Sequence, residues 1–149
     1  MTNLFEQLLK ELGAVFHLSL HADKIGACSL FIPPELVVQL QLDSSQENLF
    51  VFCKVIELPP GKFRENVFVE ALKHNANPDP IAGILAYVAA TNHLALFQNY
   101  PVSILNGERL AGLFGAFLET AENWRKAIQR GQSGPPRVGS SAPNPFGLA

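Results

Sequence analysis

The sequence predicts a single α+β domain built on an antiparallel sheet. Apolar residues recur with helical and strand periods in the order helix, three strands, helix, two strands, long helix. The strand segments follow one another directly instead of alternating with helices, and their short connections suit hairpins, so we expect antiparallel pairing. A chain of 149 residues fits one domain. We place this domain at 1–130 and expect 131–149, which is rich in Gly, Pro and Ser, to be a flexible tail.

The first two helices are predicted from apolar faces with helical spacing. The first covers about 4–12, where Asn3 and Glu6 have capping-box spacing and Gly13 is expected to end the helix. The segment that follows, up to residue 26, is expected to be mainly loop. The second helix covers about 62–74.

The strongest pattern in the chain predicts a long third helix over 107–130, with apolar residues at steps of three and four. Asn106 is the expected cap and Gly131 the expected stop. Two internal glycines, Gly112 and Gly115, each cost roughly 1 kcal/mol relative to alanine. We therefore expect them to mark the closest approach of this helix to a neighbour.

Strands are expected at 27–32, 36–42 and 49–57, and after the second helix at 81–89 and 93–97. The third of these strands is apolar on both faces, so both faces should be covered, either by the chain itself or by a partner. One face carries Leu49, Val51, Cys53 and Val55, and the other carries Phe50, Phe52 and Ile56.

Charge and hydropathy exclude several classes of function. A net charge of -2 and a pI near 6.1 argue against a nucleic-acid-binding protein, which usually carries a basic surface. No apolar run approaches the ~20 residues that span a bilayer, so we expect no membrane insertion. The N-terminus lacks the pattern of a secretory signal, which favours a cytoplasmic protein.

Side chains that could do chemistry are few and scattered. Cys28 and Cys53 lie inside apolar strand segments, which indicates buried reduced thiols. His17 and His21 have a spacing that suits metal ligands only on a helix, and no third ligand is near, so we expect ordinary surface histidines. No catalytic or phosphate-binding motif is present. We expect neither an enzyme nor a bound metal or cofactor.

Four sequence segments, taken in order, resemble class I type III secretion chaperones, small dimeric proteins that hold virulence effectors before export. The segments are FEQLLKELG at 5–13, LPPGKFRENVFVEALKHN at 58–75, ILAYVAATNHLALFQNYP at 84–101 and LNGERLAGLFGAFLETAENW at 105–124. The resemblance covers about 3–130. The resemblance is specific because the four segments occur in this order in a small, mildly acidic chain that lacks enzyme motifs.

The resemblance implies a bacterial cytoplasmic homodimer that binds the N-terminal segment of a secreted effector in extended form. A further partner that it suggests is the ATPase of the secretion apparatus. In this family the second helix and the strand after it commonly form the dimer interface, and the matching positions are Phe63, Val67, Phe68, Leu72, Ile84, Ala86 and Val88. The effector would lie in grooves between the first helix and the three-strand segment, at Phe5, Leu8, Leu9, Leu30, Ile32, Val37, Phe50 and Phe52.

Two other functions fit the same pattern. A small carrier of apolar ligands, or an enzyme with a pocket under the long helix, predicts an enclosed cavity in each monomer. A chaperone instead predicts shallow apolar grooves on the outside of a dimer. An adaptor component of the secretion apparatus would share the chaperone fold but not its client.

Overall fold

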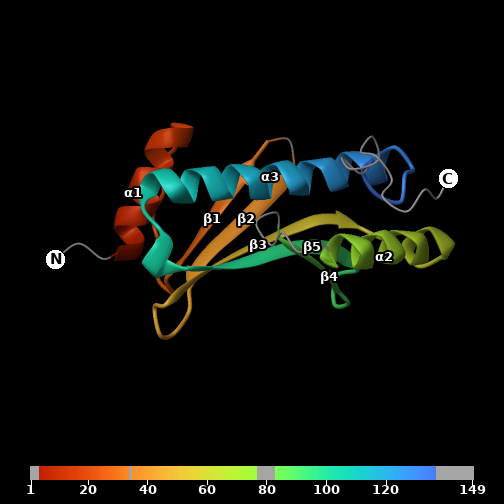
Figure 1. The fold of residues 1–149 in the computed structure, drawn as a ribbon, viewed down its shortest axis with the longest axis horizontal. Helices are drawn as coiled ribbons and strands as arrows, with labels where there is room; N and C mark the ends of the chain where they lie inside the picture. Colours follow the sequence, from red (N-terminus) through yellow and green to blue (C-terminus); the bar gives the residue numbers. More distant parts are fainter. Residues whose placement is uncertain (1–3, 34, 77–82, 137–149) are drawn as a thin grey trace, which may run out of the picture.

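A computed structural model describes residues 4–33, 35–76 and 83–136. Its five strands form one antiparallel sheet in the order β1-β2-β3-β5-β4 (Figure 1). The predicted fold class and element order are confirmed. The elements are α1 (Leu4–Phe16), β1 (Ala27–Ile32), β2 (Leu36–Leu42), β3 (Asn48–Glu57), α2 (Lys62–Asn75), β4 (Ile84–Val88), β5 (His93–Pro101), the short 3-10 helix η2 (Val102–Ile104) and α3 (Gly107–Gln129).

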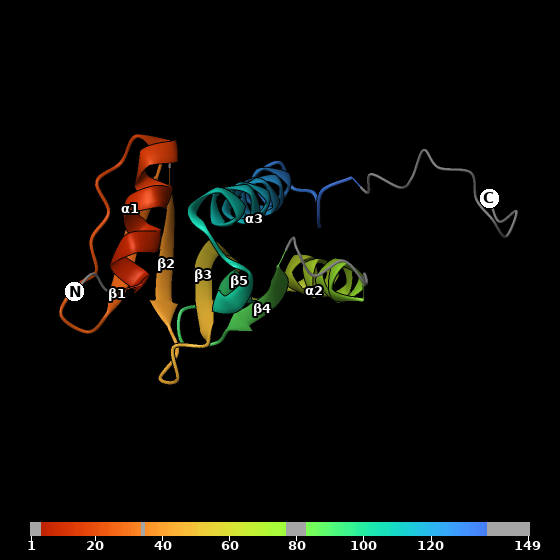
Figure 2. The same ribbon diagram turned by 60° about the vertical axis from the view of Figure 1, so that its left-hand side comes forward.

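Two helices cover one face of the sheet and the third lies at its edge. Helices α1 and α3 pack on each other, and α3 crosses β3, whereas α2 lies alongside β4 (Figure 2). Phe114 and Phe117 of α3 are at most 1% exposed, and the Phe16 ring meets the Phe114 ring edge-on at 5.6 Å. The opposite face of the sheet carries none of these helices. This one-sided arrangement leaves a sheet face and a strand edge open for binding.

Helix α1 runs past Gly13, where the sequence predicted its end, and stops at Phe16. His17 takes the left-handed conformation with φ 57°, and the Leu18 N–H donates to the Gly13 carbonyl at 2.8 Å. This is the hydrogen bond of a Schellman ending. A Cβ on Gly13 would clash with the Leu18 carbonyl oxygen. Gly13 therefore does not end the helix, but its missing side chain lets the turn after the helix fold back against it.

The ends predicted for α3 are confirmed, whereas its two internal glycines contact no neighbour within the described chain. Asn106 accepts a hydrogen bond from the Arg109 N–H at 2.8 Å, and Gly131 follows the helix with φ 83°. A Cβ added at Gly112 or Gly115 would meet no atom of the described residues within 4 Å. These two glycines therefore face open space and mark no close approach within the monomer.

The last two strands differ in length from the prediction. β4 begins at Ile84, and residues 81 and 82 of the predicted strand lie outside the described residues. β5 continues to Pro101, four residues beyond the predicted end at residue 97. Polar Gln98 and Asn99 interrupt the apolar pattern there, yet they still pair with Val51 and Phe50 of β3. Pairing with the central strand extends β5 where side-chain hydropathy gave no signal.

The chain folds back after α3. The Gln132 N–H donates to the Ala127 carbonyl at 2.9 Å, and a Cβ on Gly134 would lie 3.2 Å from Glu70 of α2 and from the Trp124 ring. The start of the predicted tail is therefore packed between α2 and α3. Residues 137–149 lie outside the described residues, so a flexible tail there stays a prediction.

Candidate partner-binding surfaces

Several residues predicted to bind an effector contribute to the core. Phe5, Leu8 and Leu9 on α1 and Leu30 on β1 are each at most 3% exposed, and Ile32 is half-buried against the same core. Helix α1 turns its apolar face onto the sheet. A partner would reach the four buried side chains only if the core opened, so in this structure they serve as core residues.

The uncovered face of the sheet carries the remaining predicted effector-binding residues. Val37 is 51% exposed and pairs across the β1–β2 ladder with Phe31, which is 59% exposed. Phe50 and Phe52 lie half-buried on the same face, with ring centroids 6.2 Å apart. Phe97 of β5 joins them, 6.1 Å from Phe50. The face thus presents an exposed apolar pair near one edge and an aromatic cluster over the central strands.

β1 forms one edge of the sheet, and the described residues cover its outer side only at the start of the strand. The Ala27 carbonyl accepts from the Asp23 N–H at 2.7 Å, and the Ala27 N–H donates to Asp23 Oδ1 at 2.9 Å. The backbone groups of Ala27 therefore point away from β2. Because their direction alternates along an antiparallel strand, those of Ser29 and Phe31 point to the same outer side. An extended peptide can pair with the strand there.

The opposite edge, at β4, is occupied by the end of α2. The Asn75 amide donates to the Leu85 carbonyl and accepts from the Leu85 N–H, both at 2.8 Å. The His74 ring Nε2 lies 3.1 Å from the Gly83 carbonyl oxygen. At Gly83 and Leu85, side chains of α2 thus take hydrogen-bonding positions that an added strand would use on this side.

Helix α2 exposes apolar side chains on its solvent face. Val69 is 50% exposed, Leu72 is 69% exposed and Phe63 is 36% exposed. Val67 is fully buried, and Phe68 packs its ring on Tyr87 of β4 at 5.0 Å. The residues predicted for the dimer interface therefore divide between an inner side that fixes the helix to β4 and an outer side available to a partner.

The β4 residues predicted for the same interface lie on a different surface. Ile84 is 38% exposed and pairs with Phe97, so it adjoins the aromatic cluster on the open sheet face. Ala86 and Val88 follow on that face and are half-buried. The structure thus places the predicted interface residues of α2 and of β4 on two adjacent surfaces of the monomer.

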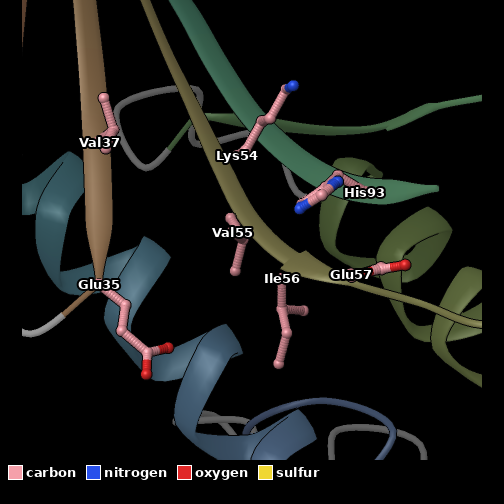
Figure 3. A pocket seen from close by; sticks show the side chains of 7 residues that line it. All are labelled: Glu35, Val37, Lys54, Val55, Ile56, Glu57 and His93. Atoms are coloured by element: carbon pink, nitrogen blue, oxygen red, sulfur yellow. The ribbon is translucent and has the colours of Figure 1, made fainter. Parts of the chain in front are cut away.

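A cleft opens where β2 and β3 separate. The β2–β3 ladder ends at the pair Val38 and Cys53, and β3 shifts its register with β5 between Lys54 and Ile56. The cleft has a volume of about 280 Å³, and its lining includes Glu35 as well as residues of β3. Figure 3 shows the Glu35 carboxylate directed toward α3 and the Lys54 side chain extending away from Glu35.

A row of alternating charges runs from α3 to this cleft. Arg125 is only 5% exposed, and its Nη2 donates to Glu122 Oε2 at 2.9 Å. Its Nη1 lies 3.6 Å from Glu35 Oε2, and Lys126 Nζ lies 3.9 Å from Glu122 Oε2. Within the described part of the chain, Arg125 Nε and Glu122 Oε1 are buried without a hydrogen-bond partner. The network therefore retains unused hydrogen-bonding capacity.

The thiols and histidines offer little chemistry. Burial raises the pKa of Cys53 to about 12 and raises that of Cys28, so both thiols stay protonated at neutral pH and are poor nucleophiles. His21 Nδ1 lies 3.9 Å from Glu6 in a polar groove beside α1. Across 4–33, 35–76 and 83–136, no three His, Cys, Asp or Glu side chains are grouped to hold a metal ion.

The chain matches a known family over most of its length. The model of the Tir chaperone protein (CesT) family matches residues 7–125. The chain belongs to this family. Membership confirms the resemblance to type III secretion chaperones that the sequence segments indicated. No curated protein sequence matches this CesT-family chain significantly. None of its described helices is long and apolar enough to cross a membrane.

Solved structures share the fold of this CesT-family chain at low sequence identity. The ExsC–ExsE complex matches with a TM-score of 0.65 and 23% identity, over 81% of this chain and 90% of that one. The HopA1–SchA chaperone–effector complex matches with a TM-score of 0.68 and 19% identity, over 83% and 94%. The Yersinia pestis type III secretion chaperone SycH, in complex with a fragment of YscM2, matches with 0.65 and 18%, over 79% and 97%.

Sequence reasoning missed some of the exposed apolar residues of this CesT-family chain. Phe31 was absent from the predicted effector-binding set and Val69 from the predicted dimer interface, although both are at least half exposed. A signal existed for Phe31, because it alternates with Leu30 and must face away from the core once Leu30 is buried. Phe97 and the cleft beside Glu35 depend on strand pairing and gave no comparable signal.

Proposed function

We propose that the chain is a type III secretion chaperone that holds an N-terminal segment of a secreted effector in extended form in the bacterial cytoplasm. The bound segment would remain soluble and unfolded until export. Family membership supports the role, and two of the structural neighbours are named as a chaperone or a chaperone–effector complex. Binding at equilibrium accounts for this role, and no catalytic step is needed.

The observation that carries the proposal is the difference between the two edges of the sheet. At β4, the side chains of His74 and Asn75 occupy backbone positions that an added strand would need. At β1, the outward backbone groups of Ser29 and Phe31 lie beside the exposed apolar side chains of Phe31 and Val37. A strand added at β1 gains backbone hydrogen bonds and apolar contacts at one place, which is the combination that strand addition uses.

We further propose that the outer side of α2 forms the contact with a second copy of the chain. Val69 and Leu72 place two large apolar side chains in water on neighbouring turns of one helix. Exposed patches of this kind are typical of protein–protein contacts. A dimer formed through α2 would leave the β1 edge of each copy free for a client.

An apolar-ligand carrier is the weaker reading. Its pocket would lie under α3, where Leu110, Phe114 and Phe117 are each at most 1% exposed and fill the space against the sheet. The clefts beside Glu35 and beside α1 are both open to the surface and have charged residues in their walls. An adaptor role in the secretion apparatus would use the same surfaces with a different partner.

Co-expression tests the proposed function. The full chain is produced with tagged N-terminal segments of the proteins exported by the type III system of the same bacterium. We expect at least one segment to stay bound through gel filtration, to be lost with Phe31→Glu and to be retained with Val15→Glu. Val15 is a matched control because it is similarly exposed, at 54%, on α1. Retention of no segment, or equal retention by both variants, would contradict the proposal.

A further inference from the structure

The described chain ends beside α2, whose outer side is the proposed contact with a second copy. A Cβ on Gly134 would lie 3.2 Å from Glu70 of α2 and from the Trp124 ring of α3. Pro135 is half-buried, and Pro136 is the last described residue. The backbone that follows α3 is therefore held against α2 at the point where the described chain stops.

Exposed apolar side chains lie next to this contact. Val69 directly precedes Glu70 and is 50% exposed, and Leu72 is 69% exposed on the same helix. Helix α2 lies along β4, whereas the exposed pair Phe31 and Val37 belongs to strands at the opposite end of the sheet order (Figure 2). The outer side of α2 is thus an exposed apolar surface that adjoins the end of the described chain.

The residues that follow are long enough to reach this whole surface. An extended chain spans ~3.3 Å per residue, so Phe146 can lie up to ~40 Å from Gly134. Helix α2 has 14 residues and is therefore ~21 Å long. A path around the helix to Val69 needs only part of the available reach, because a helix with its side chains is ~10 Å in diameter.

The sequence of this segment is that of a short apolar anchor. Phe146 and Leu148 are large apolar residues two positions apart, and no charged side chain follows Arg137. Pro143 and Pro145 restrict the backbone just before Phe146, so less conformational entropy is lost when the segment binds. Because segment and helix belong to one chain, the effective concentration of the anchor at α2 is about millimolar, and weak apolar contacts suffice.

We propose that Phe146 and Leu148 bind to Val69 and Leu72 on the outer side of α2 of the same chain. Side chains two residues apart on an extended backbone point to the same side, roughly 6.6 Å apart, and residues three apart on a helix are ~5–6 Å apart. The two pairs therefore match in spacing. In the monomer the segment covers the side chains that a second copy would contact, and association of two copies displaces it. The effect on association rests on the proposed dimer contact, whereas the contact within one chain does not.

Photocross-linking from position 146 tests the contact within one chain. Phe146 is replaced in the full chain by p-benzoylphenylalanine, which keeps an aromatic ring and forms a bond to a nearby C–H group on irradiation. At concentrations where sedimentation velocity shows a monomer, we expect an intrachain product that mass spectrometry maps to the tryptic peptide 65–73, which contains Val69 and Leu72. No cross-link to this peptide at any concentration, or a cross-link only between two chains, would overturn the proposal.

Charge substitutions on α2 identify the surface that is contacted. Val69→Glu combined with Leu72→Glu should remove the intrachain product, whereas Ile25→Glu should keep it, because Ile25 is 75% exposed in the loop before β1. Survival of the product in the double variant would also overturn the proposal. Thermal melting of each variant establishes that a lost product is not a lost fold.

The effect on self-association is measured separately, by sedimentation velocity over a dilution series. A segment that covers about half of the free molecules weakens a dimer of two uncovered copies about fourfold. We therefore expect Phe146→Ser combined with Leu148→Ser to lower the dimer dissociation constant about fourfold, and Ala142→Ser combined with Asn144→Ser to leave it unchanged.

The outcomes separate the inference from the proposed dimer contact. If the cross-link to α2 forms but removal of both anchors leaves the dissociation constant unchanged, the contact within the chain stands and its competition with a second copy is refuted. If the cross-link forms and no dimer appears at any concentration, the proposed dimer contact fails and the intrachain contact stands.

Discussion

The side chain of Asn75 pairs with the backbone of Leu85 as a strand would, through two hydrogen bonds of 2.8 Å. Asn75 is the last residue of α2, and Leu85 lies in the edge strand β4. The pair fixes the end of α2 to the sheet and blocks further pairing at that point. Among the described residues, no comparable side-chain cover is found over Ser29 and Phe31 of the β1 edge.

Removal of the Asn75 amide should destabilise the chain. Asn75→Ala leaves the Leu85 N–H and carbonyl without these partners, and we expect a loss of about 1–3 kcal/mol in the free energy of unfolding. Urea denaturation followed by circular dichroism measures the change. Asn66→Ala, at an exposed position of the same helix, should stay within ~0.5 kcal/mol of the wild type. Equal effects of the two substitutions would show that the pair has no structural role.

Alanine substitutions at glycines should have opposite effects on α3 and on α1. Gly112→Ala adds a methyl group in open space within a helix, and we expect stabilisation by about 0.5–1 kcal/mol. Gly13→Ala places a Cβ against the Leu18 carbonyl oxygen and should be destabilising. Both effects are measured as shifts of the urea denaturation midpoint, provided that the m-value, the denaturant dependence of the free energy of unfolding, is unchanged. A destabilising effect of Gly112→Ala would mean that this part of α3 contacts another molecule.

Stability should fall in alkaline solution. Burial raises the pKa of Cys53 from 9.0 to about 12 and that of Tyr100 from 10.0 to about 12. Above pH 9 the unfolded chain releases these protons first, so unfolding is favoured as pH rises toward 12. Below the pKa values of the unfolded chain, both groups stay protonated in the folded and the unfolded state, so they cause no pH dependence of the free energy of unfolding. We expect a loss of about 1–2 kcal/mol between pH 8 and pH 10.

The Cys53→Ala variant isolates the contribution of the thiol. Its baseline stability will differ because a buried side chain is shortened, so the slope of stability against pH is the quantity to compare. The variant should show a shallower fall between pH 8 and pH 10 than the wild type. An unchanged slope would indicate that the Cys53 thiol does not titrate differently in the folded chain.

Charge on the outer side of α2 should prevent self-association. Val69→Glu combined with Leu72→Glu places two carboxylates in the proposed contact, and we expect a monomer in sedimentation velocity where the wild type is a dimer. Ile25→Glu serves as a control, because Ile25 is 75% exposed in the loop before β1. A monomeric wild type, or a dimer that survives the double substitution, would place the interface elsewhere.

The sequence was most informative where local chemistry decides the structure. The bounds of β1 and β2 match the prediction, because Pro33 and its neighbour cannot continue a ladder. The end of α1 was missed because nothing in the sequence marks His17 for a left-handed conformation. Gln98 was missed in β5 because its strand conformation depends on pairing with β3.

The binding surfaces were harder to predict than the elements. An amphipathic helix such as α1 gives the same pattern whether its apolar face meets its own sheet or a partner, and Phe5 and Leu9 turned out to be core. Alternation in β3 separated Phe50 and Phe52 from the core-facing residues, but only the placement of the helices showed which side is open. The contact of the Asn75 side chain with the β4 edge could be recognised only from the tertiary structure, because Asn75 and Leu85 belong to different elements.

The most direct test of strand addition at β1 is the backbone amide exchange of Ser29 and Phe31. Hydrogen exchange resolved by NMR is measured on the full chain alone and with the effector segment that co-purifies with it. We expect exchange at both amides to slow on binding, while the Leu85 amide, already bonded to Asn75, changes little. Unchanged exchange at Ser29 and Phe31, with slowing along β4 instead, would contradict binding at the β1 edge.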